Sequence, residues 1–195
     1  SEMCIRDSCH AAFQVRESLT VSELKFVITG TAGVGKTTAI CALSDVPPVG
    51  TDADTTDELS IIKSTTTVAF DFGEVVLDDG ARVRIYGTPG QERFRHMWEI
   101  IAEGALGLII LVDNSRPDPL DDLMIYMDNF KQLIEDTGVV IGVTRCNGSD
   151  RVSIDDYYSF LERRDMFCPV LEADPRSRED MVVLMDALMA MLEYA

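Results

Sequence analysis

A glycine-rich stretch early in the chain has the residue types and spacing of a phosphate-binding loop. Residues 30–37 read GTAGVGKT and match every fixed position of the pattern GxxxxGK followed by Ser or Thr. Glycines let successive backbone N–H groups point at a phosphate, and the N-terminus of a following helix adds partial positive charge. Lys36 is expected to reach the β- and γ-phosphates, and the Thr37 hydroxyl to bind Mg²⁺. The expected nucleotide contacts in this stretch are Gly30, Thr31, Ala32, Gly33, Val34, Gly35, Lys36, Thr37 and Thr38.

Four later segments bear on how the loop is used, because kinases, ATPases and GTPases all share it. Residues 67–70 read TVAF, residues 87–95 read GTPGQERFR, residues 144–147 read TRCN, and residues 172–174 read EAD. In this order they resemble the first switch, the second switch and the two base-reading segments of the small, Ras-like GTPases. The resemblance covers residues 23–194.

The combination of these segments is most similar to the prokaryotic MglA-like branch, with an Arf-like first switch. The resemblance implies a switch that binds GTP or GDP with Mg²⁺ and hydrolyses GTP slowly. It also implies an effector protein and an activator, which in this branch is often a Roadblock/LC7-domain protein.

The resemblance further implies roles for individual residues. Thr67 is expected to close over Mg²⁺ opposite Thr37, and the Gly90 N–H to sense the γ-phosphate. Gln91 is expected to orient the attacking water, which makes Gln91, Lys36 and Thr67 the candidate catalytic residues. The expected contacts to the base are Thr144, Arg145, Asn147, Ala173 and Asp174, with a backbone N–H after the sixth strand reaching the guanine oxygen.

Two positions depart from the family pattern. Gly87 stands where most members carry an Asp that holds a water on Mg²⁺. Asn147 stands where an Asp accepts two hydrogen bonds from guanine, and an Asn offers one acceptor oxygen while turning N–H donors toward donors. Because unpaired groups cost binding energy, this change is expected to weaken selection of guanine. Arg145 in place of Lys keeps a planar head that can lie over the base.

Other functions stay open at this stage. Gly87 and Asn147 favour a pseudo-GTPase, an interaction module that holds nucleotide without significant turnover. The apolar run 108–112 followed by Asp113 has the form of a Walker B strand, and an Mg²⁺-binding Asp113 would indicate a P-loop ATPase or kinase. Arg93 and Arg95 are either surface charges or donors of positive charge to the transition state.

From residue 23 onward, strand patterns alternate with helix patterns, which predicts an α/β domain. The expected architecture is a three-layer P-loop NTPase fold with a six-stranded, mostly parallel sheet, an antiparallel second strand and helices on both faces. Strands are expected over 24–29, 67–77, 82–86, 106–112, 139–143 and 169–171. Helices are expected over 36–43, 94–105, 120–134, 153–163 and 178–194, the last with a methionine-rich stripe that favours core packing.

Composition limits the classes of partner. The 195 residues carry 17 Lys and Arg against 34 Asp and Glu, a net charge of −17, which argues against a nucleic-acid binder. The longest apolar run is far shorter than a membrane span and no secretion signal is recognisable, so a cytoplasmic protein without a membrane segment is expected. Residues 1–22 show no periodicity and are expected to be disordered or non-native, which leaves 23–195 as the G domain.

Overall fold

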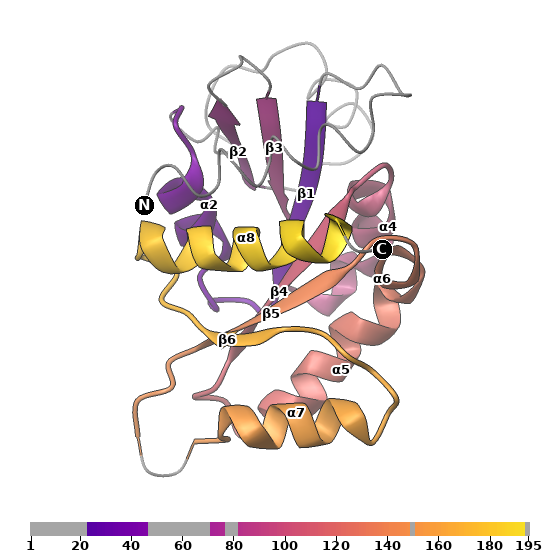
Figure 1. Ribbon diagram of the computed structural model, residues 1–195, viewed down its shortest axis with the longest axis vertical. Coiled ribbons are helices and arrows are strands. Elements are labelled where there is room, and N and C mark those ends of the chain that lie inside the picture. The colour runs from indigo at the N-terminus through magenta and orange to yellow at the C-terminus, as the bar shows by residue number, and fades with distance from the viewer. Residues whose placement is uncertain (1–22, 47–70, 77–81, 149–150, 194–195) are drawn as a thin grey trace.

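The computed structural model describes residues 23–46, 71–76, 82–148 and 151–193 (Figure 1). The strands are β1 (Glu23–Gly30), β2 (Asp71–Val76), β3 (Arg82–Gly87), β4 (Gly107–Asp113), β5 (Val139–Thr144) and β6 (Val170–Glu172). The helices are α2 (Lys36–Leu43), the 3-10 helix η1 (Glu92–Phe94), α4 (Arg95–Ala102), α5 (Pro119–Asn129), α6 (Lys131–Asp136), α7 (Ile154–Glu162) and α8 (Arg178–Glu193). The predictions for residues 1–22 and for Thr67 lie outside these ranges.

The six strands form one sheet in the order β2-β3-β1-β4-β5-β6. Strand β2 pairs antiparallel with β3, whereas every other neighbouring pair is parallel. The predicted six-stranded, mostly parallel sheet with an antiparallel second strand is therefore confirmed. Its parallel strands direct their carboxyl ends to one edge of the sheet, where ligand sites of open α/β sheets lie.

Helices cover both faces of the sheet, as predicted. Strand side chains alternate between two cores, so that Phe26 and Ile28 pack on the side of α2 and α8, and Val27 packs on the side of α4, α5 and α7. Strand β4 is buried along its whole length because both of its faces are covered. Figure 1 shows α8 lying across one face, with α4, α5 and α6 behind the other.

The methionine-rich stripe of α8 is confirmed as core. Met181, Leu184, Met185 and Leu188 are almost completely buried, and they pack with residues of β1, α2 and β3. The stripe therefore fixes α8 to the sheet and does not form an exposed partner surface.

Two helices differ from their predicted bounds. The helix predicted over 120–134 is divided at Phe130, whose backbone leaves helical geometry while its buried ring stacks on Trp98 at 5.7 Å. The helix predicted over 94–105 ends at Ala102, before Gly104 adopts a left-handed φ of 71°. In both places a tertiary contact or a glycine ends the helix before the apolar periodicity does.

Arg178 joins the start of α8 to the end of α2. Its guanidinium donates to the carbonyl oxygens of Ala42 (2.9 Å) and Leu43 (2.8 Å) and to the Asp45 carboxylate (2.8 Å). These carbonyls are among those that a helix C-terminus leaves without helical partners. Arg178 therefore stabilises the helix that follows the glycine-rich loop.

We expect Arg178→Met to lower the free energy of unfolding by about 1–3 kcal/mol, because it removes charge-assisted hydrogen bonds to partly buried carbonyls. Urea denaturation of the variant and the parent measures the change. Arg163→Met, at the exposed position that directly follows α7, is the matched control and should change stability by less than about 0.5 kcal/mol. Equal losses in the two variants would contradict a clamping role for Arg178.

Candidate functional site

The loop between β1 and α2 has the shape that phosphate binding needs. Gly30, Gly33 and Gly35 have φ values of 141°, 80° and 114°, which L side chains rarely adopt. A Cβ at Gly30 would also collide with the carbonyl oxygen of Leu111 on β4. The chain therefore leaves β1, curls, and enters α2 at Lys36, which is the strand–loop–helix arrangement predicted for a phosphate loop.

Lys36 points into the loop that precedes it. Its Nζ donates to the carbonyl oxygens of Gly30 (2.7 Å) and Thr31 (2.8 Å), and the residue is only 8% exposed. Burial lowers the pKa of Lys36 to about 8, and the Asp71 carboxylate opposes this shift. A phosphate at this position would favour the charged ammonium further.

The second-switch segment packs directly on the loop. A Cβ at Gly90 would lie 2.5 Å from the Lys36 Nζ and 2.6 Å from the Ala32 backbone nitrogen, so only glycine permits this approach. Gln91 follows it and is exposed. The Trp98 indole N–H donates to the Pro89 carbonyl at 2.8 Å, which ties the segment to α4.

Asp71 is a carboxylate at this site that the sequence analysis missed. The Thr37 hydroxyl donates to Asp71 Oδ2 at 2.6 Å. Asp71 pairs with Gly87 across β2 and β3, and a Cβ at Gly87 would lie 3.1 Å from the Asp71 Cβ and 2.8 Å from Ile40 Cδ1. The structure thus has a carboxylate beside Thr37, but it comes from β2 and not from position 87.

The sequence contained a signal for this pairing. Residues 78–80 read DDG, a turn signal in the sequence, and two strands symmetric about it would place Asp71 opposite Gly87, which is the register that β2 and β3 have. Motif positions alone do not give the strand register, which is why Asp71 is not among the predicted site residues. Thr67, the other predicted Mg²⁺ ligand, falls among the residues that the structure does not describe.

The two arginines that follow Gln91, Arg93 and Arg95, lie at the surface. Arg93 lies over the ring of its neighbour Phe94 at 4.8 Å and is exposed. Arg95 is exposed at the first position of α4. Neither of the two arginines is among the residues that line the cavity described next.

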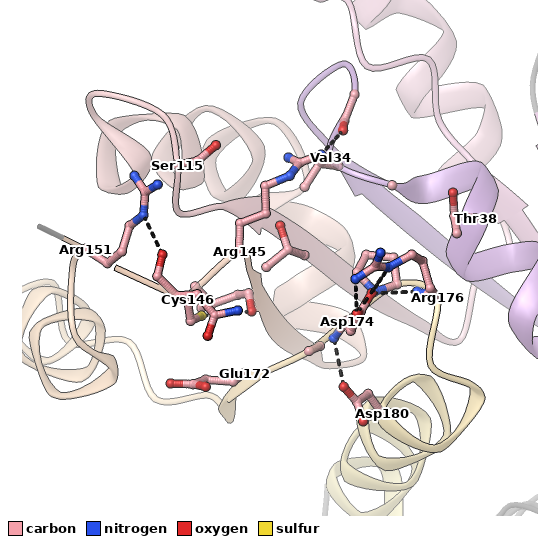
Figure 2. Close-up of a pocket in the computed structure, with 17 residues that line it drawn as sticks. Val34, Thr38, Ser115, Arg145, Cys146, Arg151, Glu172, Asp174, Arg176 and Asp180 are labelled. Carbon is pink, nitrogen blue, oxygen red and sulfur yellow. Dashed lines mark hydrogen bonds and ion pairs between the residues drawn. The ribbon is translucent and has the colours of Figure 1, made fainter. Parts of the chain in front are cut away.

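A cavity of about 620 Å³ lies between the phosphate loop and the loops after β5 and β6 (Figure 2). Of the predicted contacts, the cavity is lined by Gly33, Val34, Gly35, Thr38, Thr144, Arg145, Asn147, Ala173 and Asp174. The sequence analysis assigned no role to Ser115, Val143, Cys146, Arg151, Glu172, Pro175, Arg176 and Asp180, which also line it. Three segments far apart in the sequence therefore form one wall each.

Arg145 connects these walls. It has a left-handed φ of 56°, and its guanidinium pairs with the Asp113 carboxylate and donates to the Gly33 carbonyl at 2.8 Å. Asp113 also accepts from the Ser115 backbone N–H (3.0 Å) and hydroxyl (2.6 Å). Both carboxylate oxygens of Asp113 therefore accept hydrogen bonds from protein donors, which favours a positioning role for Asp113 over the metal-binding role considered from the sequence.

The side chains of Asn114 and Tyr157 form a buried polar pair that holds the loop after β5. The Asn114 side chain donates to the Val152 carbonyl at 2.9 Å and accepts from the Tyr157 hydroxyl at 3.1 Å. Burial raises the pKa of Tyr157, so the phenol keeps its donor proton. Arg151 donates to the Asn147 backbone carbonyl at 3.4 Å.

The loop after β6 forms the opposite wall. The Asp174 backbone N–H donates to the Asp180 carboxylate at 2.8 Å, and the Asp174 carboxylate pairs with Arg176 at 2.7 Å. Hydrogen bonds from Arg176 lower the pKa of Asp174 to about 2. The Ala173 N–H donates to the Val143 carbonyl at 2.9 Å, which anchors the loop to β5.

Within the described ranges, no group of three or more His, Cys, Asp or Glu side chains could hold a metal ion. No helix among the described residues is long and apolar enough to cross a membrane.

Curated proteins with similar sequences include small GTPases. RABE1e, a Ras-related protein of Arabidopsis thaliana, is 29% identical over 117 residues, which are 58% of this chain and 48% of the relative. The GTP-binding protein ypt2 of Schizosaccharomyces pombe is 29% identical over 112 residues, 56% of this chain and 50% of the relative. The chain thus spans about half the length of these two proteins.

An archaeal relative matches over a larger share of both chains. The protein MJ1339 of Methanocaldococcus jannaschii is 29% identical over 140 residues, 71% of this chain and 79% of the relative. Together with the sheet topology, these similarities indicate a P-loop protein of the GTPase-like type.

A family model described as a conserved hypothetical ATP-binding protein matches residues 49–194. The match begins after the phosphate loop and includes β2 through α8. It therefore includes the loops after β5 and β6, which line the cavity. The match covers well over half of this chain, so the chain belongs to this family of conserved hypothetical ATP-binding proteins.

Proposed function

We propose that this protein is a nucleotide-dependent molecular switch of the P-loop GTPase type. It binds a purine nucleoside triphosphate with Mg²⁺, hydrolyses it slowly, and is read by protein partners. The observation that carries the proposal is the continuity of the site, in which the glycine loop around Lys36, the Thr37–Asp71 pair and the cavity beside Arg145 lie together at one edge of the sheet. The resemblance and the relatives favour GTP, and the family description favours ATP.

The residues beside Thr37 fit Mg²⁺. This ion prefers oxygen ligands, keeps several waters, and takes few ligands from the protein. Thr37 supplies a hydroxyl and Asp71 a carboxylate 2.6 Å from it, which is suited to accept from a water on the ion. Mg²⁺ bound there would neutralise charge on the phosphate oxygens. Thr67 stays the predicted second ligand.

The contact of Gly90 with the phosphate loop supplies a physical basis for switching. A Cβ at Gly90 would lie 2.5 Å from the Lys36 Nζ, and from this close approach we infer that a γ-phosphate bound beside Lys36 displaces Gly90. Pro89 carries the Trp98 hydrogen bond, so the movement would reach α4, which exposes Ile100. This region is our candidate surface for the effector and activator, a Roadblock/LC7-domain protein being the activator implied by the resemblance.

Asp71 weakens the case for a pseudo-GTPase. That alternative rested partly on the missing carboxylate at position 87, and the neighbouring strand supplies one to the same space. Turnover then depends on Gln91, which is exposed beside Gly90 and free to turn toward a water.

Lys36→Ala should weaken binding of fluorescent ADP and GDP by about 10- to 100-fold, because it removes charge-assisted hydrogen bonds to phosphate. Fluorescence titration with Mg²⁺ present measures the affinity. Lys131→Ala is the control, since Lys131 is exposed and forms only a 3.7 Å ion pair with Glu135. If Lys36→Ala binds as tightly as the parent, the proposed phosphate site is wrong.

Asp71→Asn should raise the Mg²⁺ concentration needed to slow nucleotide release by about 10-fold or more, because a carboxylate partner of the metal shell is lost. Stopped-flow release of fluorescent nucleotide across a Mg²⁺ titration measures this directly. Asp128→Asn, at an exposed position on α5, controls for the change in charge. An unchanged Mg²⁺ requirement in Asp71→Asn would remove Asp71 from the site.

Gln91→Ala should leave nucleotide affinity within about twofold and slow single-turnover hydrolysis by about 10-fold or more, because water orientation is lost while phosphate contacts stay. Phosphate release from pre-bound triphosphate provides the rate. Hydrolysis as fast as in the parent would mean that another group orients the water.

A further inference from the structure

The second-switch segment leaves β3 at a fixed point, Thr88. The Thr88 backbone N–H donates to the Ile28 carbonyl at 3.0 Å, and the Thr88 hydroxyl is hydrogen-bonded to the Thr29 hydroxyl at 2.7 Å. Thr88 is 2% exposed and Thr29 is fully buried. Both the backbone and the side chain of Thr88 are therefore held by β1, so a movement of Gly90 has to arise after this residue.

Pro89 leaves the chain little freedom between this fixed point and Gly90. The proline ring locks the φ angle of Pro89, and it restricts the preceding residue, Thr88, to extended backbone. The peptide bonds on both sides of Pro89 are planar. The ψ angle of Pro89 is therefore the main rotation that can move Gly90, and the same rotation turns the Pro89 carbonyl.

The Pro89 carbonyl accepts a hydrogen bond from a donor that is itself held in place. The Trp98 indole N–H lies 2.8 Å from this oxygen, and Trp98 is only 1% exposed. The indole packs on the rings of Tyr126 at 5.0 Å and Phe130 at 5.7 Å. The indole would have to leave this packing to follow the carbonyl. Displacing Gly90 therefore costs either the hydrogen bond or part of the packing of Trp98.

This cost falls on a nucleoside triphosphate and spares a diphosphate. A β-phosphate is expected to lie within the N–H groups of the phosphate loop itself. A γ-phosphate beside Lys36 needs the space in which Gly90 approaches the Lys36 Nζ and the Ala32 backbone nitrogen. Only the third phosphate therefore has to displace Gly90.

We infer that Trp98 is a positioning residue that lowers the affinity for nucleoside triphosphates relative to diphosphates, because it holds the Pro89 carbonyl and thereby keeps Gly90 in the space of the γ-phosphate. This inference rests on the proposed nucleotide-binding function and specifies how the site distinguishes the two ligands. Trp98 acts through Pro89 and Gly90 and does not itself line the nucleotide cavity.

The sharpest experiment removes the indole N–H and keeps the shape of the side chain. The chain contains a single tryptophan, so replacing tryptophan by benzothienylalanine, which has sulfur in place of the N–H, changes position 98 alone. Competition titrations with Mg²⁺ present measure the affinities of a diphosphate and of a non-hydrolysable triphosphate. Both the adenine and the guanine forms are titrated, with fluorescent ADP and GDP as the displaced probes.

We expect the triphosphate to bind the substituted protein about 3- to 10-fold more tightly than the parent, and the diphosphate affinity to stay within about twofold, because one neutral hydrogen bond no longer opposes the displacement of Gly90. Trp98→Phe also lacks the N–H and should change the ratio of the two affinities in the same direction. Leu123→Val, which shortens another fully buried side chain of the same core, is the matched control. It should lower the melting temperature and leave the ratio unchanged. Melts followed by circular dichroism establish that each protein is folded.

The parent protein supplies an independent signal. Its one tryptophan gives one indole N–H resonance in a proton–nitrogen correlation spectrum. Adding the triphosphate analogue should shift this resonance, because displacement of Gly90 strains or breaks the hydrogen bond to Pro89. The diphosphate should shift it much less. An equal shift with both nucleotides would contradict the inference.

The outcomes separate the inference from the function on which it rests. An unchanged ratio of triphosphate to diphosphate affinity in the benzothienylalanine protein overturns the role of Trp98, and so does an equal change in both affinities. A lower ratio also overturns it, because the hydrogen bond would then favour the triphosphate. In each of these cases nucleotide binding by the parent still supports the proposed function. Binding of no nucleotide by the parent overturns both.

Discussion

The guanidinium of Arg145 is the contact on which the geometry of the whole site depends. It lies at the end of β5, pairs with Asp113 at the end of β4, and donates to Gly33 in the loop after β1. Because these three strands are parallel neighbours, their carboxyl ends already lie at one edge, and a single planar cation can join the loops that leave them. The loop after β1 and the loop after β5 are thereby held together.

A strongly acidic chain can still bind an anion because the relevant field is local. The net charge is −17, yet the Lys36 ammonium lies in the glycine-rich loop at the N-terminus of α2, where it donates to the carbonyl oxygens of Gly30 and Thr31. Two acidic residues at this edge of the sheet are paired with arginines, Asp113 with Arg145 and Asp174 with Arg176. Acidity elsewhere on the surface discourages nucleic acid without opposing a single nucleotide.

The pairing of Asp71 with Gly87 shows how a carboxylate on one strand can serve a site that is expected to use a residue of the neighbouring strand. Cross-strand neighbours share one space, so a carboxylate on β2 can reach the region that a side chain on β3 would otherwise occupy. The glycine at position 87 is the counterpart of this arrangement, since a Cβ there would crowd both Asp71 and Ile40. The glycine at position 87 suggests a lost carboxylate when only the motif is considered, but the structure retains a carboxylate near Thr37, that of Asp71.

The sequence by itself determined the elements and the phosphate loop. Apolar runs and glycine spacing are local signals, so strands such as β4, the turn into α2 at Lys36 and the buried stripe of α8 followed directly from periodicity and motif. Only the tertiary structure decided which groups meet across the sheet and which donors are already used. Asp71 beside Thr37, Arg145 on Gly33, and Asp180 on the Asp174 N–H join residues at least six positions apart, and most join different elements. Such contacts arise from strand register and helix packing, which a motif does not encode, and they decide what the cavity can bind.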